Sequence, residues 1–163
     1  MNPAEEIVKF WLQEKGYFVQ SSIKVGRKEI DILAVHSLNP ADKRHIEVQV
    51  SISPLATDPP EKEACDYQEK KFDDPNITQK IRERFGGDFP YVKEIVKGEV
   101  RYRGRDCFKL FSDECSSHGI TVIPFSTVLG EVVVALGPGS QLNPIIKTVQ
   151  LCKKFMPRIE KVK

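Results

Sequence analysis

Acidic residues within two neighbouring apolar runs are the part of this sequence best suited to do chemistry. Asp31 lies in the β-branched run at 30–35, and Glu47 lies in the run at 46–52, where apolar and polar residues alternate. Strict alternation predicts a strand on which Glu47 and Gln49 share one face. An acid in an apolar strand is costly to bury unless its charge is compensated. A divalent cation with oxygen ligands would compensate two carboxylates that face one pocket.

A turn joins the two runs. Residues 37–43 contain an Asn-Pro pair and an Asp, which are typical of turns, so the whole segment is predicted to be a β-hairpin. His36 and His45 flank it, and we interpret them as turn or edge residues rather than catalysts. Glu29 is interpreted as a solvated acid at the start of a strand. The alternative for the whole motif is an edge hairpin with hydrated acids, against which Asp31 argues because it lies between two isoleucines.

The arrangement resembles the motif of the PD-(D/E)XK nuclease superfamily, in which an Asp is followed by Glu-x-Lys on the next strand. Here the motif reads Asp31, then Glu47, Val48 and Gln49, with glutamine in place of lysine. The resemblance is greatest to the archaeal Holliday-junction resolvase and Mrr-like branch. The matching positions are Glu5, 16–19, 26–34 and 46–50.

The resemblance implies a set of site residues. Asp31 and Glu47 would bind Mg²⁺ or Mn²⁺, with the Val48 carbonyl oxygen as a further ligand. Glu5 matches a glutamate that resolvases carry on their first helix, although the helix dipole alone also favours an acid there. Gln49 can orient a water but carries no charge. The missing positive charge would come from Lys28, Lys71 or Lys80.

The same resemblance implies a magnesium-dependent endonuclease that hydrolyses DNA phosphodiesters, with branched or structured DNA as the substrate. A resolvase works as a two-fold dimer, so a homodimer is expected, with the amphipathic C-terminal helix as the candidate interface. The alternative is a catalytically inactive relative that binds nucleic acid or a protein partner. Gln49 favours that alternative, whereas the intact acids favour the enzyme. A structural or assembly protein that uses residues 53–100 is a third interpretation.

Basic residues form local clusters, although the net charge of +2 neither requires nor excludes nucleic acid. Arginines bind phosphate in a bidentate manner, and clusters of them favour contact with a nucleic-acid backbone. Surface charges that only aid solubility are the alternative for any one cluster. The residues predicted to contact DNA are Arg27, Lys28, Arg101, Arg103 and Arg105.

Length and composition indicate one globular domain. The chain has 163 residues, of which 40% are hydrophobic and 29% are charged. It has no apolar run of membrane-spanning length and no visible signal peptide, so we expect a cytoplasmic protein without a membrane partner. The four cysteines form no CxxC pair and are expected to be reduced structural thiols. A zinc set of Cys107, Cys115 and His118 matches no common zinc module.

Hydrophobic periodicity and turn residues predict an α/β fold with a restriction endonuclease-like core, in which helices flank a mixed central sheet in the order α-β-β-β-α-β-α-β. Asn2 and Pro3 favour the start of the first helix, Gly86 is expected to end the helix at 76–85, and Pro157 is expected to follow the end of the last. Residues 126–136 fit a strand or a helix, and Ser126 as an N-cap favours the helix. Residues 1–163 would form a single domain, with 53–100 as a longer crossover or insertion and 142–157 as a C-terminal helix. Helices are predicted at 3–15, 61–71, 76–85, 105–118, 126–136 and 142–155, strands at 17–25, 30–35, 46–52, 91–96 and 120–124, a loop at 53–60, and a linker at 137–140.

Overall fold

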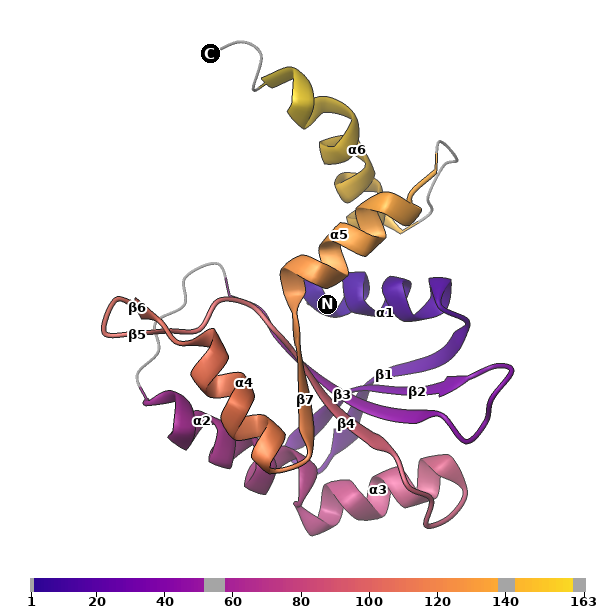
Figure 1. Ribbon diagram of the computed structural model, residues 1–163. Helices are drawn as coiled ribbons and strands as arrows, with labels where there is room; N and C mark the ends of the chain where they lie inside the picture. The colour runs from indigo at the N-terminus through magenta and orange to yellow at the C-terminus, as the bar shows by residue number, and fades with distance from the viewer. Residues whose placement is uncertain (1, 52–57, 138–142, 160–163) are drawn as a thin grey trace.

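The computed structural model describes residues 2–51, 58–137 and 143–159. It begins with helix α1, Pro3–Glu14 (Figure 1). The Asn2 side chain caps this helix by accepting a hydrogen bond from the Ala4 N–H at 3.1 Å, as the sequence predicted. The acids of the first turn, Glu5 among them, lie where the helix dipole favours negative charge. One apolar face of α1 packs into the core through Ile7, Val8, Trp11 and Leu12.

A mixed five-stranded sheet forms the centre of the molecule. Its strands are β1, Tyr17–Val25; β2, Lys28–His36; β3, Lys43–Gln49; β4, Val92–Lys97; and β7, Ile120–Pro124. They lie in the order β1-β2-β3-β4-β7. The β1–β2 and β2–β3 pairs are antiparallel, whereas β3–β4 and β4–β7 are parallel. The predicted hairpin and the predicted mixed sheet flanked by helices are therefore confirmed.

Helices cover both faces of this sheet (Figure 1). On the face of α1 lie α5, Phe125–Ala135, and α6, Pro144–Ile159. The other face carries α2, Pro60–Tyr67; the π-helical turn η1, Gln68–Phe72; α3, Pro75–Phe85; and α4, Phe108–Ser117. Parallel strands require a long connection, and α2, η1 and α3 form the one between β3 and β4. They lie within the predicted crossover at 53–100.

Alternation along β3 sends neighbouring side chains to opposite faces of the sheet. Ile46 and Val48 join the apolar core beneath α1. His45 and Glu47 face the opposite layer, where His45 packs against Phe72 of η1. The polar residues of the motif therefore lie beneath the crossover between β3 and β4.

A short hairpin replaces the start of the helix predicted at 105–118. Strand β5, Arg101–Tyr102, pairs antiparallel with β6, Arg105–Asp106, before α4 begins. The intervening residues Arg103 and Gly104 have φ angles of 50° and 77°. Tight two-residue hairpin loops require such positive φ angles. The prediction was wrong because strands of two residues are too short to show alternation.

Other element ends agree in part with the sequence predictions. Helix α3 ends at Gly86, as predicted, and this glycine adopts the left-handed conformation. Ser126 lies inside α5 and is not its cap, because the helix begins directly after Pro124. Helix α6 continues past Pro157, which lies in its last turn and removes one backbone hydrogen bond there. The predicted loop at 53–57 and the linker at 138–140 lie outside the described residues. Over the part of the chain that the structure describes, no helix is long and apolar enough to cross a bilayer.

Candidate active site

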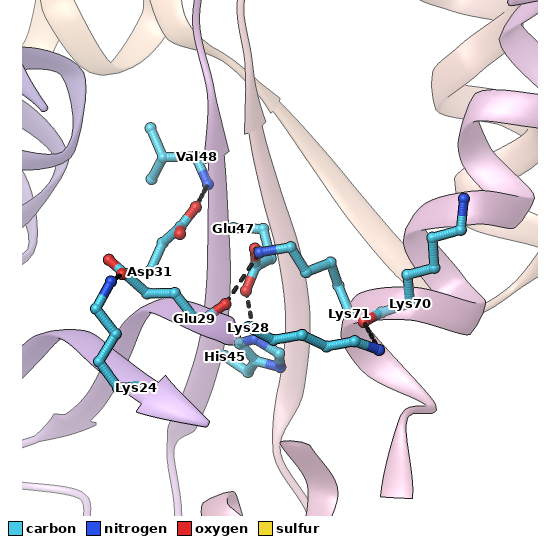
Figure 2. A network of polar contacts seen from close by, with 9 residues as sticks. All are labelled: Lys24, Lys28, Glu29, Asp31, His45, Glu47, Val48, Lys70 and Lys71. Atoms are coloured by element: carbon cyan, nitrogen blue, oxygen red, sulfur yellow. Dashed lines mark hydrogen bonds and ion pairs between the residues drawn. The ribbon is translucent and has the colours of Figure 1, made fainter. Parts of the chain in front are cut away.

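Asp31 and Glu47 come from neighbouring strands, at the end of the sheet where β2 begins and β3 ends (Figure 2). The antiparallel register pairs Ile32 of β2 with Ile46 of β3. One residue further along the two strands, Asp31 therefore lies opposite Glu47. Asp31 Oδ2 accepts a hydrogen bond from the Val48 N–H at 2.8 Å. The two acids of the motif therefore lie together. Val48 contacts Asp31 through its N–H, whereas the family resemblance implied a role for its carbonyl oxygen.

The Glu47 carboxylate is 1% exposed, and both of its oxygens have partners (Figure 2). Oε1 lies 2.9 Å from His45 Nε2, and Oε2 lies 2.5 Å from Lys71 Nζ. Because a carboxylate only accepts hydrogen bonds, His45 Nε2 carries the hydrogen. Two contacts of this kind hold the Glu47 side chain in one orientation.

His45 is fully buried, so its interpretation as a turn or edge residue was wrong. Strand β3 already begins at Lys43, which places His45 inside the sheet. Its ring centroid lies 4.7 Å from that of Phe72. His36, in contrast, ends β2 and packs edge-on against Tyr17. His45 is a positioning residue, because it fixes a Glu47 oxygen.

The environment of Asp31 disfavours its charged form. Burial, and next the charge of Glu47, raise the pKa of the Asp31 carboxyl from 3.8 to about 7. The Val48 N–H and the Lys71 ammonium act in the opposite direction. Glu5 adds a smaller repulsion, which places this predicted site residue within electrostatic range of Asp31. Two ionised carboxylates at this position therefore destabilise the folded protein unless further positive charge is supplied.

Asp31→Asn is expected to stabilise the metal-free protein at high pH. Because the folded state binds the Asp31 proton more tightly than the unfolded state does, stability of the wild type falls as pH rises from about 4 through about 7. Asparagine carries no charge and still offers an oxygen to the Val48 N–H. The variant's gain in free energy of unfolding over the wild type should be larger at pH 8 than at pH 5, by on the order of 1–3 kcal/mol. Urea unfolding in chelator at both pH values measures it, and an equal difference at both would contradict the raised pKa.

Gln49, at the position of the motif lysine, pairs with a lysine from another strand. The parallel register places it beside Lys97 of β4. Lys97 Nζ donates a hydrogen bond to Gln49 Oε1 and lies 2.6 Å from Glu63 Oε1 of α2. Lys97 is only 4% exposed, and its Nζ lies 4.8 Å from the centroid of the Phe111 ring. A buried ammonium group thus lies beside the glutamine.

One of the three lysines proposed from the sequence reaches the acids. Lys71 does so from η1, a widened helical turn of the kind often found at functional sites. Lys28 instead lies 2.5 Å from Asp74, and Lys80 lies 2.9 Å from Glu83. Positive charge at the site therefore comes from the β3–β4 crossover and from β4.

A cleft of about 560 Å³ lies beyond the carboxyl ends of β3, β4 and β7. In proteins with parallel strands, ligands often bind just beyond the carboxyl ends of those strands. The volume of the cleft is in the range of known ligand pockets. Lys97 lines the cleft and so connects it to Gln49, while the β5–β6 hairpin contributes Arg101 and Asp106. Other lining residues are Val50, Gly98, Phe108 and Phe125.

The basic residues predicted to contact DNA lie on two separate hairpins. Arg27 and Lys28 are exposed where β1 turns into β2. Arg101, Arg103 and Arg105 are exposed on the β5–β6 hairpin. Arg101 Nε lies 2.9 Å from Glu99, whereas Arg103 extends over the Tyr102 ring at 5.2 Å from its centroid. The second cluster is adjacent to the cleft through Arg101.

Three side chains of the site were missed from the sequence, namely His45, Glu63 and Lys97. The run Ile95, Val96, Lys97 carried a usable signal, because a lysine that ends a parallel strand lies at the edge where ligands bind. His45 precedes Glu47 by two residues and so shares its strand face. Glu63 is one of several acids in the α2 segment, and nothing in the sequence distinguishes it.

The chain matches no family model and no curated protein.

Proposed function

We propose that this protein is a metal-dependent nuclease that hydrolyses DNA phosphodiesters. The observation that carries the proposal is the pair of acids on adjacent strands, half-buried Asp31 and buried Glu47, with Lys71 beside Glu47 and Lys97 beside Gln49. The resemblance to the PD-(D/E)XK superfamily supports the same reading, with a restriction endonuclease-like core.

The donor set of the two acids fits Mg²⁺ or Mn²⁺. These hard cations prefer carboxylate and carbonyl oxygens, and Mg²⁺ is often bound through only one or two carboxylates. The oxygens of Glu47 each have one partner, which leaves lone pairs for a cation. A bound cation would also offset the repulsion that raises the pKa of Asp31. Asp31 and Glu47 would hold the ion.

The chain's own residues would then orient the reactants. A divalent cation at this site supplies Lewis acidity, which activates a water for attack and offsets negative charge on the phosphate. Lys71 and His45 would keep the Glu47 carboxylate in place. The Val48 N–H would fix Asp31 in the same way.

Lys97 would supply the charge that the motif places at Gln49. Its ammonium lies beside the Gln49 side chain, and Lys97 is among the residues that line the cleft. A cation there would stabilise the charge that develops on a phosphate in the transition state. Gln49 itself would accept a hydrogen bond from Lys97 and donate one to water or to the phosphate.

The β5–β6 hairpin would guide the DNA backbone to this cleft. Replacing Arg101, Arg103 and Arg105 together with alanine is expected to weaken DNA binding equally for all sequences. Each lost phosphate contact lowers the magnitude of the slope of log K against log salt by about 0.9, so three lost contacts lower it by about 2.7. Fluorescence anisotropy from about 50 to 200 mM salt measures this slope. Lys109→Ala, which removes an exposed lysine of α4, is the control, and an unchanged slope in the triple variant would contradict the assignment.

Incubation of the full chain with single-stranded, duplex and four-way-junction DNA tests the proposed function. We expect cleavage that requires Mg²⁺ or Mn²⁺ and stops in chelator, with branched DNA preferred. A two-fold dimer would present two such sites to a junction, and sedimentation with and without DNA measures this state. Metal-dependent binding without cleavage would indicate an inactive nuclease-fold protein, and neither binding nor cleavage would refute the proposal.

A further inference from the structure

A second group of metal-binding side chains lies where α2 packs against α4. The buried residues Ala64, Phe111 and Cys115 belong to one apolar cluster at this contact, and Figure 1 shows the two helices side by side. Ala64 has a small side chain, which allows the helices to approach closely. The contact brings Cys65 of α2 to Glu114 and His118 at the end of α4.

The three donor atoms lie at distances that suit a single small ion. Cys65 Sγ is 3.9 Å from His118 Nε2, and the same nitrogen is 3.4 Å from Glu114 Oε1. All three donor atoms lie within 4.8 Å of one another. In a tetrahedral zinc site, the bond lengths of about 2.0–2.3 Å place neighbouring donors roughly 3.3–3.6 Å apart. Small side-chain rotations would therefore close the three ligands on one ion.

The types of the donors select the ion. Sulfur, imidazole nitrogen and carboxylate oxygen together suit Zn²⁺, whereas Mg²⁺ prefers oxygen ligands alone. Each of the three side chains is partly exposed, so an ion can reach them. Cys115 is different, because its side chain is fully buried in the apolar cluster. The zinc set considered from the sequence shares only His118 with this group, since Cys107 and Cys115 do not belong to it and Cys65 comes from another helix.

We infer that Cys65, Glu114 and His118 form a zinc-binding site that joins α2 to α4, with the fourth position open to water. The i,i+4 spacing places Glu114 and His118 on one side of α4, facing Cys65. A bound ion would fix α2 and the adjoining η1, the segment that supplies Glu63 and Lys71. The site does not depend on the proposed nuclease function.

Titration of the metal-free full chain with Co²⁺ tests this inference, because a thiolate bound to Co²⁺ gives a charge-transfer absorption band. We expect one equivalent of Co²⁺ to produce the band and Zn²⁺ to abolish it by displacement. A hundredfold excess of Zn²⁺ over its dissociation constant should raise the melting temperature by roughly 5–10 °C. The band and the thermal shift should disappear in Cys65→Ser and weaken in His118→Gln.

Two controls make the result specific. Cys152→Ser, on the exposed side of α6, should retain the full band. Asp31→Asn should retain it as well, since that site has only oxygen donors. Absence of the band from the wild type would overturn the inference. It would also be overturned if folded Cys65→Ser kept the band, or if Cys152→Ser lost it equally.

Discussion

Glu47→Gln is expected to lower the rate of metal-dependent DNA cleavage by on the order of 10²–10³-fold or more. Glutamine keeps the size of the side chain and an oxygen for the buried hydrogen bond from His45. It removes the negative charge that would bind the cation. Lys71, whose side chain is 30% exposed, can turn to water when its partner is neutral, so the fold should persist. Single-turnover cleavage in Mg²⁺, alongside circular dichroism of both proteins, measures the effect.

Glu29→Gln provides the matched control for this result. Glu29 is a second acid of β2 and forms a surface ion pair with Lys24. Its loss should change the cleavage rate little, because exposed ion pairs contribute little and Glu29 is not a proposed ligand. Equal losses in Glu29→Gln and Glu47→Gln would mean that the acids of the site are wrongly assigned.

Variants of Lys97 and Glu63 should differ in whether they reduce activity or stability. Lys97→Met is expected to slow cleavage by about 10²-fold, since it removes a cation from the site. Its effect on stability should be small, because methionine preserves contacts with Phe111, and Glu63, 21% exposed, can hydrate. Glu63→Gln should instead destabilise the fold by about 3 kcal/mol, because it leaves the buried Lys97 ammonium without its carboxylate partner.

Urea unfolding and cleavage kinetics of both variants measure this separation. Lys93→Met is the matched control, since Lys93 lies on the same strand but pairs with Asp73 near the surface. That variant should lose little cleavage activity. Unchanged cleavage by a folded Lys97→Met protein would leave Lys97 with only a structural role.

Local patterns in the sequence predicted much of the fold. Alternation at 46–52 predicted β3 and the shared face of Glu47 and Gln49, and Asn2 with Pro3 predicted the start of α1. Such signals succeed because side-chain period and capping depend on residues close in the chain. The β5–β6 hairpin was not predicted, because its strands are short and because arginine as a residue type does not indicate the positive φ that Arg103 adopts.

In the candidate site, too, contacts within a local motif could be predicted, whereas contacts between distant segments could not. Asp31 and Glu47 lie on consecutive strands, so a local motif could predict their meeting. Lys97 reaches Gln49 through the register of two parallel strands, which hydrophobic period does not specify. Cys65 reaches His118 only through the packing of α2 on α4. Contacts between distant segments depend on tertiary packing and were therefore missed.

Calorimetric titration with Mg²⁺ tests most directly whether Asp31 and Glu47 together hold a cation. Magnesium is the informative ion, because the Cys65, Glu114 and His118 group has donors that it disfavours. We predict that the wild type binds Mg²⁺ and that Asp31→Asn and Glu47→Gln, both folded, each lose measurable binding. Mg²⁺ binding that is absent from the wild type, or unchanged in both variants, would contradict this account.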